Sequence, residues 1–242
     1  MAWSAGDWDA EFADEDSTTT LTVADATTGD VLHERLAPLG PDSSVVGFLD
    51  ENRILVTAAN NGSEGVYVWN LDADTLDGWT PGYNAAIALT PSGDIGAFVQ
   101  DAGENGTAVV DTESGQVLWT ADYLSARTFS PDGQYAAFVQ GWFEAVDEEA
   151  GQRGSASADR RVDLVVVEAR TGEEVLRIDV ESTQRFAWEP DGNLVLEAWQ
   201  DSSQMALVRC SLDGECELAT EPRIADVPPD ASQPPYHLGD NY

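Results

Sequence analysis

Short blocks of hydrophobic residues alternate along this chain with polar turns that contain Pro and Gly. Three such turns share one design, with Pro in the second place and Gly in the fourth: Pro91 with Gly93, Pro131 with Gly133, and Pro190 with Gly192. Each follows an apolar run and precedes another. Pro presets φ and Gly relieves the exit of a type I turn. The pattern therefore predicts tight hairpins between β-strands.

A second turn motif alternates with the first. Residues 25–29, 111–115 and 168–172 follow β-branched runs, end in Gly and lead into another apolar run, and Asn70 and Cys210 begin two weaker copies. The leading positions 25, 70, 111, 168 and 210 are separated by 45, 41, 57 and 42 residues. Residues 48–53 are interpreted as a degraded copy of the first motif. Two hairpins per interval describe a four-stranded antiparallel unit, which is the blade of a β-propeller.

The repeats predict an all-β chain of four full blades and one partial blade. We label the strands of a blade a to d from the inside outward. The expected blades are residues 1–40 (partial, without strand a), 44–82, 83–122, 123–181 and 182–220, followed by a Pro-rich tail at 221–242. The ring then has five blades, or the chain is a fragment of a six- to eight-bladed ring. The missing strand comes from the tail or from residues upstream of Met1 in a longer reading frame. We favour the second, because Pro is poor strand material.

Two segments resemble the repeat of the TolB-type, or WD40-like, β-propellers. They are residues 127–138 (RTFSPDGQYAAF) and 166–172 (VVEARTG), and the resemblance extends from about residue 21 to residue 220. Residues 111–119 are also similar to quinoprotein propeller repeats. The resemblance implies a propeller fold. It does not identify a function, because such propellers serve as binding platforms, peptidase accessory domains and enzymes.

Charge narrows the possible partners. The chain has 45 acidic residues against 11 basic ones, which are all Arg, and its net charge is −34. Such a surface repels nucleic acids and anionic membranes, so neither is expected as a partner. It favours cations or basic proteins, or it reflects a salt-adapted source. Apolar runs are far shorter than the ~20 residues that span a bilayer, and the N-terminus does not resemble a signal peptide.

Two of the predicted b–c connections are unusually long, at residues 7–17 and 141–160. Long loops on a rigid scaffold commonly carry binding sites. Both combine aromatic and acidic residues, and we expect them to form a binding rim; the alternative is a pair of solvated insertions. The candidate binding residues are Trp8, Asp9, Trp142, Phe143, Glu144 and Asp147.

Catalytic signatures are scarce in the sequence. It has two His, no G-x-S-x-G elbow, no zinc-ligand spacing and no phosphate-binding Gly loop. We therefore expect a non-catalytic module that binds a protein or a small molecule. The alternatives are an enzyme, or an accessory domain of one, acting on glycans or peptides, and a purely structural module. No cofactor is expected, although Asp72, Asp74 and Asp77 offer Ca²⁺ three carboxylates on one turn, a cluster that also arises easily in so acidic a chain.

The two cysteines flank a predicted c–d turn. Cys210 and Cys216 occupy the places that Asp111 and Val117 hold in another blade, so they fall on opposite strands of a hairpin. Cross-strand Cβ atoms approach disulfide distance there. A disulfide implies an oxidising compartment, and we expect an extracellular or cell-envelope location. The alternative is two reduced cysteines.

Overall fold

The computed structural model describes residues 1–6, 18–40, 43–58, 65–79, 83–99, 106–122, 124–140, 162–180, 185–200 and 204–224. Within these ranges every regular element is a β-strand. The chain forms two compact units, Met1–Asp122 and Tyr123–Asn241, which are described separately below.

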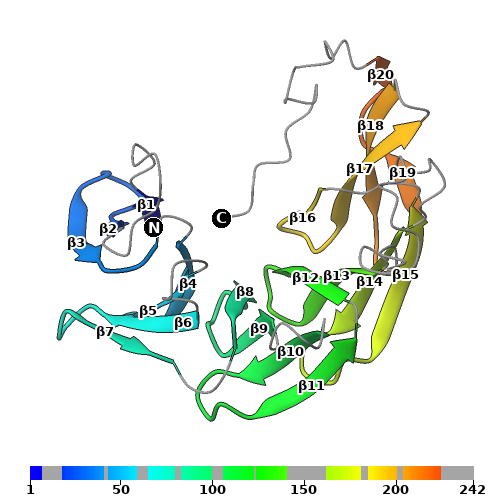
Figure 1. The fold of residues 1–242 in the computed structure, drawn as a ribbon. Coiled ribbons are helices and arrows are strands. Elements are labelled where there is room, and N and C mark those ends of the chain that lie inside the picture. The colour runs from blue at the N-terminus through cyan, green and yellow to red at the C-terminus, as the bar shows by residue number, and fades with distance from the viewer. Residues whose placement is uncertain are drawn as a thin grey trace, which may run out of the picture. The chain divides into compact units, whose positions relative to one another are not determined.

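The first unit contains three antiparallel sheets whose strands follow chain order (Figure 1). The first sheet has three strands, β1 (Ala2–Gly6), β2 (Thr19–Ala24) and β3 (Val31–Ala37). The second has β4 (Ser44–Asp50), β5 (Arg53–Ala58), β6 (Gly65–Asn70) and β7 (Thr75–Gly78). The third has β8 (Ala85–Leu89), β9 (Ile95–Val99), β10 (Gly106–Asp111) and β11 (Val117–Asp122).

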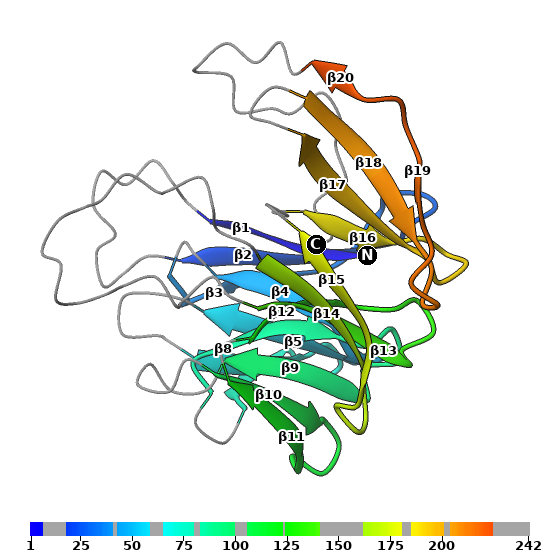
Figure 2. The same cartoon turned by 90° about the vertical axis from the view of Figure 1, so that its right-hand side faces the viewer.

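The second unit contains two further antiparallel sheets (Figure 2). The fourth sheet has β12 (Leu124–Phe129), β13 (Tyr135–Gln140), β14 (Val162–Glu168) and β15 (Glu174–Val180). The fifth has β16 (Phe186–Trp188), β17 (Leu194–Gln200), β18 (Gln204–Cys210) and β19 (Cys216–Leu218), and β20 (Arg223–Ile224) also pairs with β18. The expected all-β class is confirmed: within the described residues, four sheets have four or more strands and the first has three.

The second sheet packs against a neighbouring sheet on each of its faces. Ile54 and Trp69 pack on one face against Leu21 of the first sheet, whereas Leu55 packs on the other face against Phe98 of the third. The apolar run of β5 lacks the polar alternation of a half-exposed strand because both of its faces are buried. In the second unit, Leu164, Val166 and Leu176 of the fourth sheet pack against Leu194 and Leu196 of the fifth.

The first turn motif forms the predicted a–b hairpins. In each of three sheets the Gly N–H donates to the carbonyl oxygen three residues earlier, as a type I turn requires. The pairs are Gly93 to Thr90 at 2.9 Å, Gly133 to Ser130 at 2.8 Å and Gly192 to Glu189 at 3.0 Å. The Thr90 and Ser130 hydroxyls also accept hydrogen bonds from the backbone where the next strand begins.

The hairpin at residues 48–53 differs from this motif. Pairing continues to Asp50 opposite Arg53, so the turn consists of Glu51 and Asn52 alone. The Asp50 carboxylate accepts hydrogen bonds from the Asn52 N–H at 2.9 Å and from Arg53 Nε at 2.7 Å. Without Pro and Gly to open a longer turn, the side chain of Asp50 closes a shorter one.

The second motif forms the c–d hairpins, and its leading acid caps the turn. Asp25 Oδ1 accepts hydrogen bonds from the N–H groups of Thr28 at 2.9 Å and Thr27 at 2.7 Å, which lower the pKa of Asp25. The residue after the leading position then donates its N–H across the sheet to the a–b turn. Thr112 does so to the Asp94 carbonyl at 3.0 Å. The two turns are therefore joined at one end of the sheet.

The fifth sheet contains the predicted disulfide. Cys210 on β18 lies opposite Cys216 on β19, and the two sulfur atoms are bonded. The Cys210 side chain is buried with Leu194 and Leu196, whereas Cys216 is exposed. The disulfide thus links the outer strand of the sheet to its core.

Gly93 and Gly115 provide a matched test of turn geometry. Both have left-handed backbones, with φ of +74° and +69°. A Cβ at Gly93 would lie 2.4 Å from the Leu49 carbonyl oxygen, whereas a Cβ at Gly115 would meet nothing within 4 Å. Gly115→Ala should cost about 1–2 kcal/mol of unfolding free energy, from backbone strain alone. Gly93→Ala should cost clearly more in urea denaturation, and equal losses would contradict the close packing at Gly93.

The disulfide makes a second prediction. The denatured, unreduced protein should contain no free thiol, because Cys210 and Cys216 are both bonded. The double variant Cys210→Ala/Cys216→Ala should lose about 2 kcal/mol of unfolding free energy, since the bridge closes a short loop. Thiol titration and urea denaturation measure the two quantities. Two titratable thiols would rule out the bridge.

Candidate functional site

The predicted binding loops fall outside the described residues. Trp8 and Asp9 belong to residues 7–17, and Trp142, Phe143, Glu144 and Asp147 belong to residues 141–161. Their role in binding stays a prediction.

The turn that carries Asp72, Asp74 and Asp77 is shaped by one substitution within the repeat. Asp74 occupies the fifth place of the second motif, which is Gly29, Gly115 or Gly172 in other sheets. Its backbone is left-handed like theirs, with φ of 48°. A residue with a Cβ is strained in this conformation, although Asp tolerates it better than most. Side-chain contacts must therefore stabilise the turn.

The Asp74 carboxylate provides these contacts. Its Oδ1 atom accepts hydrogen bonds from Arg35 Nη1 at 2.7 Å and from the buried indole Nε1 of Trp69 at 3.1 Å. Arg35 Nη1 also donates to the Asp74 carbonyl oxygen. The bond from Arg35 is the main reason why the pKa of Asp74 is lowered. Because Arg35 lies on β3, the ion pair joins the first sheet to the second.

The other two aspartates of this turn are arranged differently. Asp77 Oδ2 accepts a hydrogen bond from Thr75 Oγ1 at 3.0 Å, and Asp72 is exposed. Across the described ranges, no group of three or more His, Cys, Asp or Glu side chains is placed to hold a metal ion. Calcium binding at this turn stays a prediction, and the ion would have to compete with Arg35 for Asp74.

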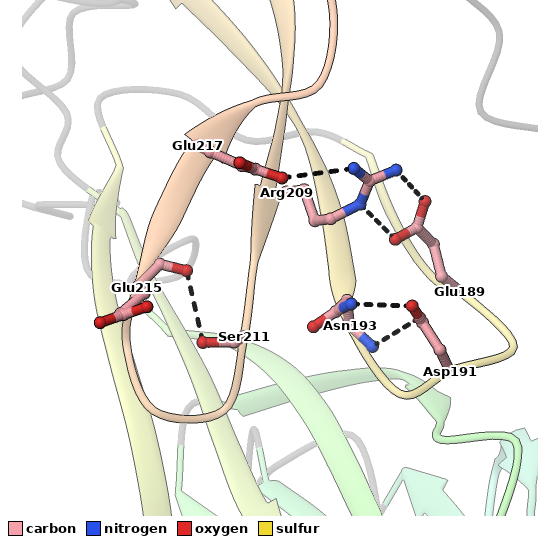
Figure 3. A network of polar contacts seen from close by, with 7 residues as sticks. All are labelled: Glu189, Asp191, Asn193, Arg209, Ser211, Glu215 and Glu217. Atoms are coloured by element: carbon pink, nitrogen blue, oxygen red, sulfur yellow. Dashed lines mark hydrogen bonds and ion pairs between the residues drawn. The ribbon is translucent and has the colours of Figure 1, made fainter.

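A charged network connects the strands of the fifth sheet (Figure 3). Arg209 on β18 binds both carboxylate oxygens of Glu189, at 2.5 and 2.7 Å, and contacts Glu217 on β19 at 3.5 Å. These acids, Glu189 first, raise the pKa of Arg209. Glu189 replaces the Ser or Thr of the first motif, so its carboxylate is free to reach Arg209 across the sheet. The Arg209 guanidinium is thus engaged by Glu189 and Glu217, and its bonds to Glu189 stabilise the turn between β16 and β17.

Three aromatic rings form a cluster in the first unit that sequence reasoning missed. Trp79 follows β7, Tyr83 precedes β8, and Phe98 lies on β9. The Phe98 ring centroid is 4.7 Å from that of Trp79 and 5.0 Å from that of Tyr83, and the Trp79 and Tyr83 centroids are 6.2 Å apart. Phe98 is fully buried, whereas Trp79 and Tyr83 are partly exposed. The cluster therefore joins the core to the surface.

The cluster lies at the strand ends opposite the regular turns. The Trp79 N–H donates to the carbonyl oxygen of Val66, near the start of strand c, at 2.7 Å, and Phe98 is near the end of strand b. These are the ends from which the b–c and d–a connections leave. Burial raises the pKa of Tyr83, so its phenol stays protonated over a wider pH range. Half-exposed Trp and Tyr offer an apolar surface together with a hydrogen-bonding group, which suits ligand recognition.

The sequence contained a signal for this cluster. Trp79 and Tyr83 flank a Pro81-Gly82 pair in the short connection between two blades, and such a pair favours a turn. Reasoning from loop length passed over this connection because it is short.

Comparison with known proteins identifies the fold. No family model and no curated protein match the chain. Among solved structures, hydrazine synthase of Kuenenia stuttgartiensis is similar at a TM-score of 0.52 and 14% identity, over 85% of this chain and 64% of that one. TolB of Acinetobacter baumannii is similar at a TM-score of 0.51 and 20% identity, over 86% of this chain and 50% of that one. Pyrococcus horikoshii acylaminoacyl peptidase is similar at a TM-score of 0.50 and 12% identity, over 92% of this chain and 33% of that one.

This chain thus spans between a third and two thirds of the length of these three structures. No helix within the described residues has the length and apolarity needed to cross a membrane. At such low identities the similarities carry no information on activity. They do show the architecture: the sheets are blades of a TolB-like, WD40-like β-propeller fold.

The lowered pKa of Asp74 predicts an acid-sensitive contribution to stability. Its ion pair with Arg35 favours the ionised carboxylate in the folded state, so the contribution is complete above the unfolded pKa of about 4 and is lost as pH falls through the folded pKa. Asp74→Asn retains an acceptor for Trp69 and a tolerated left-handed backbone but removes the ion pair. The difference in melting temperature between wild type and Asp74→Asn should therefore be largest at neutral pH and shrink in acid.

Asp72→Asn is the matched control because it removes one charge from the same turn and leaves the ion pair in place. It should not change the acid dependence of the melting temperature. A wild-type-to-Asp74→Asn difference that stays constant between pH 7 and pH 3 would contradict the proposed linkage.

Proposed function

We propose that this chain is a non-catalytic binding module that takes a protein or small-molecule partner at the strand ends carrying the b–c and d–a connections. The aromatic cluster of Trp79, Tyr83 and Phe98 carries the proposal. Its inner ring is fixed in the core, and its two outer rings are partly exposed. A surface that is rigid before binding loses little conformational entropy when a ligand docks.

The cluster also contributes to packing. Trp79 and Tyr83 contact the apolar core between the second and third sheets, so part of their surface is committed to stability. Packing alone favours Phe or Leu at both positions. The indole and the phenol each add a polar group to a partly exposed ring, and this supports a role in recognition.

Charge and redox state restrict the partner and its location. A net charge of −34 argues against nucleic acid and favours neutral or basic ligands. The Cys210–Cys216 disulfide is consistent with an oxidising compartment, which supports the proposal of a location at the cell envelope or outside the cell. The similarity to TolB supports a propeller scaffold for this proposed binding role, but it does not identify the ligand.

A selection experiment tests the binding site. A displayed peptide library and an oligosaccharide array are screened with the full chain, and the ligands found are titrated against variants by calorimetry. Trp79→Leu and Tyr83→Phe preserve much of the packing. They should weaken binding about tenfold, because each removes the polar group that distinguishes the cluster from an ordinary core contact.

Tyr135→Phe is the matched control, since Tyr135 is a half-buried tyrosine at the a–b turn of the fourth sheet. It should leave the affinity unchanged. Ligands that bind all variants equally would overturn the assignment of the site. Cleavage of any selected peptide or glycan by the wild type would overturn the non-catalytic proposal in favour of the enzyme alternative.

A further inference from the structure

A buried glycine lies beneath the aromatic cluster. Gly96 is on β9, two residues before Phe98, so the two positions belong to the same face of the third sheet. A glycine in the interior of a strand has no side chain to pack and weakens the strand. Its presence at a buried position therefore calls for an explanation.

The Phe98 ring fills the space that a side chain at position 96 would need. A Cβ at Gly96 would lie 2.6 Å from Phe98 Cε2, 2.8 Å from Phe98 Cζ and 3.0 Å from Leu89 Cδ2. Non-bonded carbon atoms pack best at about 3.5–4.0 Å, so an alanine at this position excludes the ring from its place. Because Cε2 and Cζ belong to the far edge of the ring, the ring leans back along β9 and covers Gly96.

The fourth sheet shows that the strand itself does not require this glycine. β13 begins Tyr-Ala-Ala-Phe-Val where β9 reads Ile-Gly-Ala-Phe-Val, so Ala136 takes the place of Gly96. Each of the two pairs with the last residue of its inner strand, and their register is therefore the same. Phe98 and Phe138 are both fully buried. This strand thus accommodates a buried Phe together with an alanine, and what Gly96 adds is room for the particular position of the Phe98 ring.

The backbone beside the two outer rings is held on both sides of the short connection. The Trp79 N–H donates to the Val66 carbonyl oxygen at 2.7 Å, and the Asn84 N–H, next to Tyr83, donates to the Val99 carbonyl oxygen at 3.3 Å. Val66 is on the second sheet and Val99 on the third. Trp79 and Tyr83 therefore extend from fixed backbone, and the orientation of their rings depends on what they pack against.

Phe98 is the ring against which both of them pack. Its centroid is 4.7 Å from that of Trp79 and 5.0 Å from that of Tyr83. Tyr83 is next to the residue that bonds to Val99, which follows Phe98 on β9, whereas Gly96 precedes it. An alanine at position 96 would therefore turn the Phe98 ring toward the outer rings. The stack would rearrange, and the strand would remain.

We propose that Gly96 is a positioning residue of the aromatic cluster: it leaves room for the Phe98 ring, and the ring in this position orients Trp79 and Tyr83 for a ligand. Gly96 is itself buried and acts through Phe98. Rings that are oriented before binding lose little conformational freedom when a ligand docks, so their misplacement lowers the affinity. This inference rests on the proposed binding function and extends the site to a residue that acts without touching the ligand.

Fluorine NMR tests the placement of the rings without a ligand. The eight Trp of the chain are replaced by 5-fluorotryptophan, and the signal that disappears in Trp79→Leu is that of Trp79. Gly96→Ala should shift this signal, because the Phe98 ring that stacks on the Trp79 indole takes a new position. The signals of the other Trp are the reference. An unchanged Trp79 signal would overturn the proposal.

Binding is measured with the displayed peptide library and the oligosaccharide array as the probes. Gly96→Ala should weaken binding of the ligands that the wild type selects about tenfold, because the outer rings must then be ordered on binding. Gly78→Ala is the matched control, since it makes the same substitution on β7, beside Trp79, where a Cβ would meet nothing within 4 Å. It should leave the affinity unchanged. Equal affinities of Gly96→Ala and the wild type would contradict the positioning role.

The variants also separate this inference from the proposed function. If Trp79→Leu weakens binding and Gly96→Ala does not, the binding site stands and the positioning role of Gly96 falls. If neither variant changes the affinity, or no probe binds the wild type, the proposed function fails and this inference fails with it.

A melting curve checks that Gly96→Ala folds. The variant should unfold cooperatively, as the wild type does, because Ala136 occupies the same place in the fourth sheet. A variant that does not fold would show that Gly96 serves the packing of the strand itself, and this result too would overturn the positioning role.

Discussion

Strand β5 of the second sheet has buried side chains on both of its faces, and the other elements of the first unit are arranged around this constraint. Ile54 and Leu55 point to opposite sides of β5, and each is fully buried against a different neighbouring sheet. Burial of such a side chain stabilises the fold by about 1.5–3 kcal/mol, and an isolated sheet loses this on at least one face. A sheet buried on both faces is stable only between two neighbouring sheets. Those neighbours must therefore have a similar width and strand order to cover it. Variation is then confined to turns, connections and edges.

This division explains what could be predicted from the sequence. Pro and Gly act locally through φ, and the hairpins at Pro91, Pro131 and Pro190 could therefore be located without structural information. The turn at Glu51 and Asn52 could not, because its length depends on how far β4 and β5 remain paired. The disulfide was predictable because the repeat placed Cys210 and Cys216 at the base of a hairpin.

Functional features follow the repeat less closely, and sequence reasoning located them less well. Trp79, Tyr83 and Phe98 are close in space because residues on either side of the connection between β7 and β8 pack against β9. Nothing in their spacing shows that the rings stack. The carboxylate of Asp74 was considered as a metal ligand, but its direction is set by Arg35, which is distant in sequence. Such pairs depend on how the sheets pack, and one sequence contains no measure of that.

The Asp74 turn also affects how this protein can change over evolutionary time. A glycine adopts its left-handed conformation without help, whereas Asp74 relies on Arg35 in one sheet and Trp69 in another strand. The order of substitutions therefore matters. A lineage that first replaces Asp74 by glycine leaves Arg35 free to vary, whereas one that first loses Arg35 retains a strained turn. Asp in place of Gly at position 74 thus makes the tolerated substitutions at positions 35 and 74 depend on the order in which they occur. Turns with Gly at this place impose no such order.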